Sequence, residues 1–122
     1  MIGAEDIKKI EKKFGYDSIV NFFYEGLAQA KKDNKWFHID HNGKPVYKER
    51  YDYVGDFYEG LAQAEKDNEW FHIDCNGKPA YKERYDQIGN FYEGLSSVEE
   101  NNRYFHIDCN GKPAYKEKYD YV

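Results

Sequence analysis

A unit of 34 residues occurs three times in this chain, and this period limits the fold more than any other feature of the sequence. Its clearest marker is Phe-Tyr-Glu-Gly-Leu, which recurs at 23–27, 57–61 and 91–95. A period of about 20 to 50 residues is typical of stacked supersecondary units that bury their apolar faces against their neighbours. Function is therefore expected to depend on an extended surface and not on one enclosed pocket.

The composition indicates a folded chain with a thin aromatic core. Charged residues make up 34% of the 122 residues and the mean hydropathy is -1.04, yet 19% are aromatic. Disordered chains are poor in aromatic residues, whereas here these residues recur at fixed positions in the repeat. The chain therefore has enough apolar material, regularly placed, to build a core.

Charge and hydropathy limit the partners and the location of the protein. A net charge of -5 without a basic block argues against binding of nucleic acid or of an anionic membrane surface. No apolar stretch has membrane-spanning length, and no secretory signal is visible at the start. We therefore expect a cytoplasmic protein without nucleic-acid or membrane partners, exported only if it is part of a longer exported protein.

Residues 1–15 are predicted to form a short amphipathic helix. Ile7, Ile10 and Phe14 recur at helical spacing, and Gly15 follows where a left-handed C-terminal cap is usual. We expect this helix to cap the open apolar end of the array, as terminal repeats generally require. An oligomerisation helix is the alternative.

The β-repeat array is predicted to occupy residues 16–122. Recurring Tyr-Asp dipeptides divide it into units of about 16–50, 51–84 and 85–118. Residues 119–122 repeat the opening of a unit, so they belong to a longer array or cap the third unit. The close similarity of the units indicates recent duplication or consensus design.

Two turn signals divide each unit into strands. Asn-Gly, the strongest short hairpin signal, predicts a type I′ turn in which both central residues have positive φ. It stands at 42–43, 76–77 and 110–111. The second signal, upstream, is Asp33-Asn34 in the first unit, where both residue types tolerate left-handed conformations.

These turns predict an all-β fold: an open array of three antiparallel three-stranded β-meanders with a capping helix at the N-terminus. In the first unit the strands are expected at 23–30, 35–41 and 44–49. The register then places Asp40 opposite Pro45 in a pair without ladder hydrogen bonds, so the proline loses none.

Alternation along the strands separates two faces of each meander. The first is expected to form the core and contains Ala28, Ala30, Phe37, Ile39 and Val46. The second combines aromatic rings with a histidine and an aspartate, and we take it as the candidate binding face. Its residues are Trp36, His38, Asp40, Tyr47, Trp70, His72, Asp74, Tyr81, Tyr104, His106, Asp108 and Tyr115.

The repeat resembles the WG-repeat family of bacterial proteins. That family repeats Tyr-Asp, then Phe-x-Glu-Gly-Leu-Ala, then Lys-Trp-Gly-Tyr-Ile-Asp and Gly-Lys, and the first unit matches at 16–17, 23–28, 35–36, 39–40 and 43–44. The Trp-Gly dipeptide that gives the family its name is replaced by Trp-Phe in the first two units and by Tyr-Phe in the third. The tyrosine that follows this dipeptide in the family is replaced by histidine in all three units. The resemblance implies an all-β module that mediates interactions, and it implies no catalytic residues.

A His-x-x-His or His-x-x-Cys motif in each unit contains side chains that zinc prefers. The motifs occupy 38–41, 72–75 and 106–109. Residues i and i+3 of a strand point to opposite faces, so no metal site is expected. The histidines are expected instead to pair with the tyrosines of the same hairpins, Tyr47 and its equivalents.

Cys75 and Cys109 occupy equivalent positions in the second and third units. A disulfide needs Cα atoms within about 7 Å, which a tightly coiled solenoid permits and an edge-to-edge array does not. We expect two free, partly buried thiols in a reducing compartment.

No constellation of residues indicates an enzyme. The sequence has no Gly-rich phosphate loop, Ser-His-Asp signature or nucleophile elbow. Three copies of one set of groups are also poorly suited to catalysis, which needs unlike groups with separated pKa values. We predict a non-enzymatic module without a cofactor.

The repeated aromatic face is expected to act as a protein-interaction or structural scaffold, with a protein partner or a second copy of the chain. The alternative is a carbohydrate or cell-wall-ligand module, similar to choline- and glucan-binding repeats, whose rings hold a cation or stack on sugars. A third alternative is that the rings pack unit against unit and bind nothing. The lack of an export signal favours the first.

Overall fold

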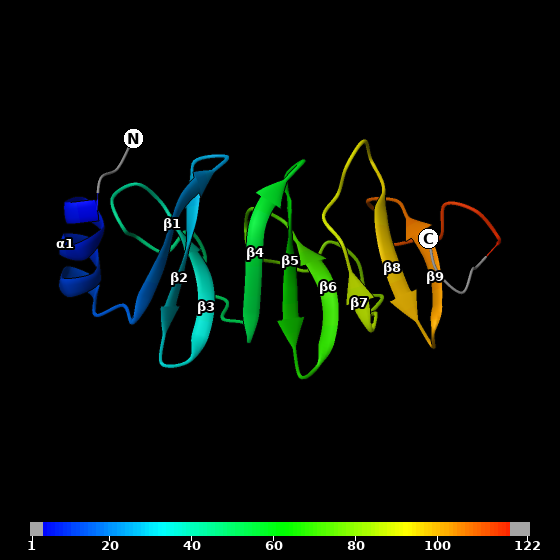
Figure 1. Cartoon of the computed structure of the whole chain (residues 1–122), viewed down its shortest axis with the longest axis horizontal. Coiled ribbons are helices and arrows are strands. Elements are labelled where there is room, and N and C mark those ends of the chain that lie inside the picture. The colour runs from blue at the N-terminus through cyan, green and yellow to red at the C-terminus, as the bar shows by residue number, and fades with distance from the viewer. Residues whose placement is uncertain (1–3, 118–122) are drawn as a thin grey trace.

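The computed structural model describes residues 4–117, which form one helix followed by nine strands in three separate antiparallel sheets (Figure 1). The elements are α1 (Ala4–Phe14), β1 (Ser18–Tyr24), β2 (Leu27–Lys32), β3 (Lys35–Ile39), β4 (Tyr53–Tyr58), β5 (Leu61–Lys66), β6 (Glu69–Ile73), β7 (Gln87–Ile88), β8 (Ser96–Glu100) and β9 (Arg103–Ile107). The sheets follow one another along the long axis of the molecule, with α1 at one end (Figure 1). The partial unit predicted at 119–122 lies outside the described residues.

The predicted fold class is confirmed, but the strands that make up each meander differ from the prediction. The segment 23–30 is two strands, because Glu25 and Gly26 both have positive φ, 50° and 82°, and turn the chain between β1 and β2. The segment 44–49 is not a strand. It forms one isolated bridge to β3 and then leads to the next unit.

The Asn-Gly turn is not the predicted type I′ turn. Gly43 has a φ of 86°, but Asn42 is not among the residues with positive φ. A carboxylate oxygen of Asp40 accepts hydrogen bonds from the backbone N–H groups of Asn42 and Lys44, at 2.9 and 3.0 Å. The aspartate of each Ile-Asp pair therefore stabilises the turn that follows it.

This turn shifts the register by one residue, so that Pro45 faces Ile39 and not Asp40. The flanking hydrogen bonds run from Asp40 N to Lys44 O, at 3.0 Å, and from Val46 N to His38 O, at 3.1 Å. The proline thus occupies a pair without ladder hydrogen bonds, as the sequence predicted, but with a different partner.

The upstream turn is confirmed. Asp33 and Asn34 have φ values of 54° and 65°, and a carboxylate oxygen of Asp17 accepts a hydrogen bond from Asp33 N at 3.0 Å. The same bond joins Asp52 to the second unit's turn at 2.9 Å. The Tyr-Asp dipeptide that opens each unit therefore supplies the carboxylate that holds this turn.

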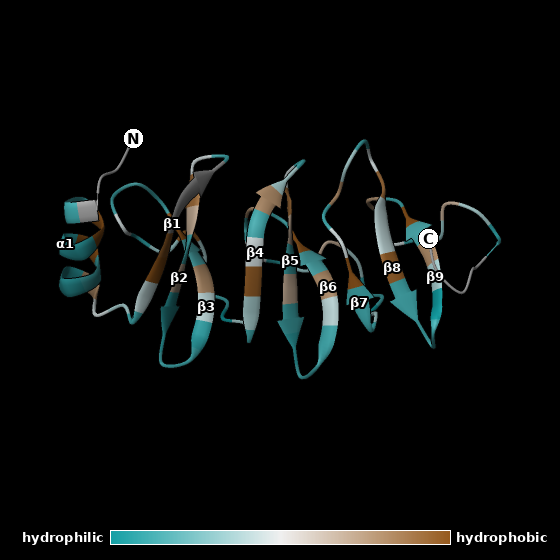
Figure 2. Cartoon of the chain, viewed as in Figure 1, coloured by the Kyte–Doolittle hydropathy of each residue, from teal (hydrophilic) through white to brown (hydrophobic). Residues whose placement is uncertain are grey.

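The predicted core face is confirmed by burial. Ala28, Ala30, Phe37 and Ile39 are fully buried, whereas Val46 is half-buried. Their equivalents join them in a single apolar cluster that runs through all three units. In Figure 2 the apolar segments lie in the middle of the strands and the hydrophilic ones at the turns.

Helix α1 covers the first unit. A Cβ atom added to Gly43 would lie 2.4 Å from Ile10 Cγ2 and 2.9 Å from Phe14 Cε2. At the equivalent Gly77, the contacting atoms belong to Tyr47 of the preceding unit. The helix thus takes the place of a preceding repeat. No helix within residues 4–117 is long and apolar enough to cross a membrane.

Candidate functional site

The histidine of the first unit lies between that unit and the next one. Nδ1 of His38 is 2.5 Å from the hydroxyl of Tyr47, and Nε2 is 2.7 Å from the carbonyl oxygen of Gly55. A carbonyl oxygen only accepts, so Nε2 carries the proton and Nδ1 accepts from the tyrosine hydroxyl. The ring also packs on Phe57, with centroids 4.5 Å apart.

The second unit repeats this arrangement. His72 bonds the hydroxyl of Tyr81 at 2.6 Å and the carbonyl oxygen of Gly89 at 2.8 Å. Its ring lies 4.5 Å from that of Phe91. The predicted pairing of histidines with hairpin tyrosines is therefore confirmed, and each pair also holds the following unit.

Burial lowers the pKa of His38 and of His72 to about 4, because the interior disfavours the charged imidazolium. Both rings are therefore neutral at pH 7, which agrees with the tautomer required by the carbonyl oxygens. Burial also raises the pKa of the Tyr47 and Tyr81 hydroxyls, so these remain protonated donors.

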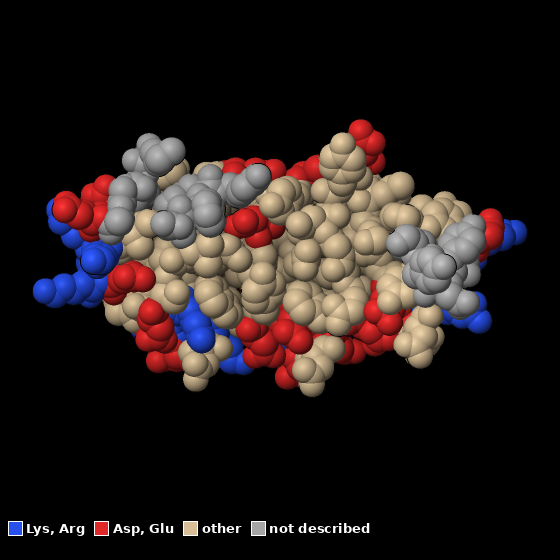
Figure 3. Space-filling view, viewed as in Figure 1, with Lys and Arg blue, Asp and Glu red and all other residues tan. Residues whose placement is uncertain are grey.

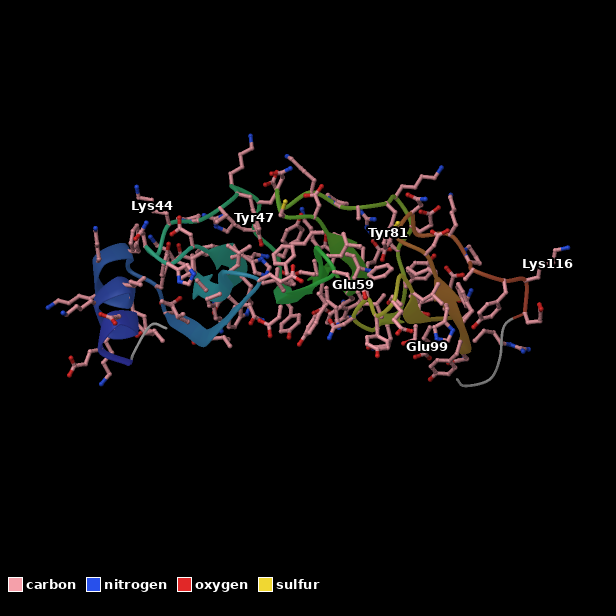
Figure 4. The ribbon with its side chains drawn as sticks, turned by 90° about the horizontal axis from the view of Figure 1, so that it is seen from above. Lys44, Tyr47, Glu59, Tyr81, Glu99 and Lys116 are labelled. Carbon is pink, nitrogen blue, oxygen red and sulfur yellow. The ribbon has the colours of Figure 1, made fainter. Side chains whose placement is uncertain are left out.

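The tyrosines after the Asn-Gly turns fill the gaps between units. Figure 4 shows Tyr47 and Tyr81 along one side of the ribbon. A Cβ atom added to Gly77 would lie 2.3 Å from Tyr47 Cγ, and one added to Gly111 would lie 2.4 Å from Tyr81 Cγ. In addition, the Tyr51 hydroxyl donates to the carbonyl oxygen of Gly77 at 2.5 Å. Glycine at these turns is thus required by packing as well as by positive φ.

The candidate binding face is therefore not one exposed surface. His38, His72, Tyr47 and Tyr81 are buried, so the prediction that they line an exposed face is wrong. The alternation along the strands was right, but the next unit packs against this side of each meander and covers it. These four residues join repeats.

The other members of the predicted face have three separate positions. Asp40, Asp74 and Asp108 are half-buried and bind backbone N–H groups of their turns. His106 and Tyr115 are half-buried in the third unit and bond each other at 2.6 Å. Trp36, Trp70 and Tyr104 are half-buried at the start of the third strand of their sheets.

Trp36, Tyr53 and Trp70 form what we call the aromatic row. The ring centroids of Trp36 and Tyr53 are 6.4 Å apart, and those of Tyr53 and Trp70 are 5.7 Å apart. Tyr53 is 39% exposed, and the ammonium group of Lys31 lies 5.9 Å from the Trp36 ring. The row crosses from the first unit to the second.

Tyr53 was missed in the sequence because it does not recur: the equivalent residue is Ser18 in the first unit and Gln87 in the third. Beside Gln87 and Tyr104 is a small hollow of about 90 Å³. The face of the molecule viewed in Figure 3 is largely uncharged in its centre, with acidic side chains along its lower edge.

The metal-like motifs do not bring ligands together. His38 is buried while His41 is exposed, and residues 4–117 contain no group of three or more His, Cys, Asp or Glu side chains placed to hold a metal. Cys75 and Cys109 are free thiols, and both are exposed. The expectation that they are partly buried is wrong, because both stand on the outside of a turn.

The comparisons with known proteins bear on the repeat itself. None of the curated proteins compared with this chain matches it. A family model described as WG containing repeat matches three consecutive segments, at residues 9–36, 39–70 and 73–104. These segments cover most of the chain, and each ends at the aromatic residue that precedes a Phe-His-Ile-Asp stretch. The chain belongs to the family of WG containing repeat proteins.

Proposed function

We propose that this chain is a non-enzymatic protein-interaction module whose binding surface is the aromatic row. The observation that carries the proposal is the exposed Tyr53 ring held between two tryptophan rings of successive units. Tyrosine and tryptophan supply large, rigid, amphipathic contact area and dominate the energetics of protein interfaces.

The row is held rigidly by the backbone. Trp36 and Tyr51 exchange two backbone hydrogen bonds, of 2.8 and 3.0 Å, and Trp70 and Tyr85 exchange two of 2.9 Å. Each tryptophan is thereby fixed at the junction of two units. A preorganised surface loses little conformational entropy when a partner binds, which supports a role in recognition.

The ring geometry favours a protein partner over a carbohydrate. The planes of Trp36 and Tyr53 meet at 60°, and those of Tyr53 and Trp70 meet at 58°. Because neighbouring rings are tilted, part of each ring face packs against the next ring. The row therefore has no flat platform on which a sugar ring could stack. Its polar rim includes Lys31 and Glu65, both half-buried, as is usual around protein interfaces.

We assign no catalytic role. The two histidines with strongly lowered pKa values, His38 and His72, have both ring nitrogens engaged in hydrogen bonds that hold successive units together. Their perturbed pKa values follow from burial between repeats, which is a structural cause.

The test is affinity capture followed by titration of a purified captured protein against wild type, Tyr53→Ala and Lys44→Ala. Lys44→Ala is the control, because Lys44 is exposed and lies on the side of the molecule opposite Glu99 (Figure 4). Glu99 occupies in the third unit the position that Glu65 occupies in the second, and Glu65 pairs with Tyr53. We expect Tyr53→Ala to weaken binding at least tenfold and Lys44→Ala to leave it unchanged. Equal binding by all three chains would contradict the proposal. Saturable quenching of tryptophan fluorescence by a glycan, lost in Tyr53→Ala, would reassign the row to carbohydrate binding.

A further inference from the structure

The third unit has a hollow of about 360 Å³ at the end of the array that is farther from α1. We call it the end hollow. Its lining residues are Asn90, Tyr92, Glu93, Leu95, Ser97 and His106. All belong to the third unit, and the first two units have equivalents at the same repeat positions.

In the second unit, the equivalent positions are engaged by the third unit. Gln63, the equivalent of Ser97, donates its side-chain N–H to the Asn90 side-chain oxygen at 2.7 Å. The Glu59 carboxylate, the equivalent of Glu93, accepts from the backbone N–H groups of Glu93 and Gly94, at 2.5 and 2.9 Å. His72, the equivalent of His106, bonds the Gly89 carbonyl oxygen at 2.8 Å.

These contacts come from one short segment, 89–94, with the pattern Gly-x-Phe-x-x-Gly. The first glycine offers its carbonyl oxygen to the histidine, the phenylalanine packs on the imidazole ring, and the final Glu-Gly turn offers N–H groups to the glutamate. The segment 55–60 has the same pattern and makes the first two of these contacts with His38. Two filled copies thus define the occupant of this kind of hollow.

The end hollow presents the same groups. Nδ1 of His106 bonds Tyr115 at 2.6 Å, as the inner histidines bond their tyrosines, and both His106 and Glu93 line the hollow. Tyr92 is 74% exposed and Leu95 is 40% exposed, whereas their second-unit equivalents are half-buried. Among the described residues, no Gly-x-Phe-x-x-Gly segment is placed against these groups.

The opposite end of the array is closed. Ile10 and Phe14 of α1 lie against Gly43 where a preceding unit would place its tyrosine. A second copy of this chain with α1 in place therefore cannot dock its first unit on the end hollow. The matching partner is a repeat without such a helix before it.

We propose that the end hollow is a docking surface for the Gly-x-Phe-x-x-Gly strand and turn of a further repeat of this kind whose first strand is uncovered. His106 binds the first glycine's carbonyl oxygen and the face of the aromatic ring, and Glu93 binds the N–H groups of the turn. Within residues 4–117 the array thus has one end covered by α1 and one end that recognises repeats, on a surface distinct from the aromatic row.

The test is titration of the ¹⁵N-labelled full chain with a synthetic peptide of residues 87–95, followed by NMR. We expect saturable shifts confined to the residues of the end hollow. The same peptide carrying Phe91→Ala should bind at least tenfold more weakly. Absence of saturable shifts at millimolar peptide, equal binding of the two peptides, or shifts located on the aromatic row would each overturn the proposal.

Two variants of the full chain complete the test. Ser97→Trp fills the end hollow without removing the His106 to Tyr115 bond, and it should weaken peptide binding at least tenfold while the remaining NMR spectrum stays that of the folded chain. Tyr53→Ala should bind the peptide as wild type does. Unchanged peptide binding by Ser97→Trp would overturn the proposal. Tyr53 is outside the end hollow, so the peptide titration stays valid even if the aromatic row proves not to be an interaction surface.

Discussion

Nε2 of His38 lies 2.7 Å from the carbonyl oxygen of Gly55, so a side chain of one repeat is hydrogen-bonded to the backbone of the next. The bond needs a proton on Nε2, and the hydrogen bond that Nδ1 accepts from the Tyr47 hydroxyl needs a neutral imidazole. Burial provides that state by lowering the pKa of His38 to about 4. The contact between repeats is therefore sensitive to protonation.

The first expected outcome is a loss of stability in mild acid. The pKa of His38 and of His72 is about 4 in the folded chain, against an ordinary value of 6.5. The unfolded chain therefore binds more protons between these values, and the stability present above pH 6.5 is lost as the pH falls toward 4. Each histidine accounts for about 3 kcal/mol over this range. Urea unfolding at a series of pH values measures the loss.

Two matched variants test whether His38 causes this loss of stability. His38→Gln should reduce the pH dependence of the unfolding free energy, whereas His41→Gln, which alters an exposed residue, should leave it unchanged. Carboxyl groups also titrate in acid, among them Glu49, Asp52 and Glu83, whose pKa values are lowered by lysine partners, so the quantity compared is the difference between the two variants at each pH. An identical pH dependence in both variants would exclude His38 as a source.

The second expected outcome concerns two glycines with the same backbone conformation. Gly60 and Gly77 both have a φ of 78°, but a Cβ atom at Gly60 meets nothing within 4 Å, while one at Gly77 meets the Tyr47 ring at 2.3 Å. Gly60→Ala should therefore cost about 1 kcal/mol of backbone strain. Gly77→Ala should cost about 1–3 kcal/mol more through overpacking. Equal losses in chemical denaturation would show that Tyr47 does not pack on the turn.

The third expected outcome is a difference between two tyrosine hydroxyls. Tyr47→Phe removes the donor to His38 and leaves a buried nitrogen unsatisfied, which should cost about 1–3 kcal/mol in the free energy of unfolding. Tyr53→Phe removes the hydroxyl of a residue that is 39% exposed, and it should change stability by less than about 0.5 kcal/mol. A loss in Tyr47→Phe no larger than in Tyr53→Phe would contradict the buried bond.

The fourth expected outcome concerns the thiols. Cys75 and Cys109 are free and exposed, so both should react with Ellman's reagent in the native chain at rates close to those in denaturant. Cys75→Ser and Cys109→Ser should each leave one reactive thiol. A native chain with one or both thiols protected would contradict the position of these turns.

Much of the fold could be predicted because the repeat carries local signals. Ile39 and Phe37 alternate with Trp36 and His38, and strand parity placed the first two in the core. Asp33-Asn34 is a turn by residue type alone. These features depend on a few neighbouring residues and therefore survive in any packing of the units.

The missed turn at Glu25-Gly26 shows where local signals are insufficient. Glutamate is unusual at positive φ, so a Phe-Tyr-Glu-Gly-Leu segment looks like continuous strand. In the second unit the carboxylate of the equivalent Glu59 binds backbone N–H groups of the next unit's turn. The glutamate at this turn position is thus explained by a contact between repeats, and the sequence of a single unit does not reveal that contact.

The candidate site was only partly predictable for the same reason. The sequence placed Trp36 and His38 on one face, but only the stacking of units decides that His38 is covered and Trp36 half-exposed. Tyr53 joins the aromatic row through ring contacts with tryptophans of two units. A residue that occurs once in the repeat pattern has no periodic signal, so only the packed array reveals it.

The central claim is that neutral, buried histidines hold successive repeats together, and an NMR titration of the imidazole carbons tests it most directly. The account predicts that His38 and His72 titrate with a pKa of about 4 and that Gly55→Pro, in the strand that His38 contacts, disturbs the titration of His38 more than that of His72. A pKa near the ordinary 6.5 for both rings in the folded chain would contradict it.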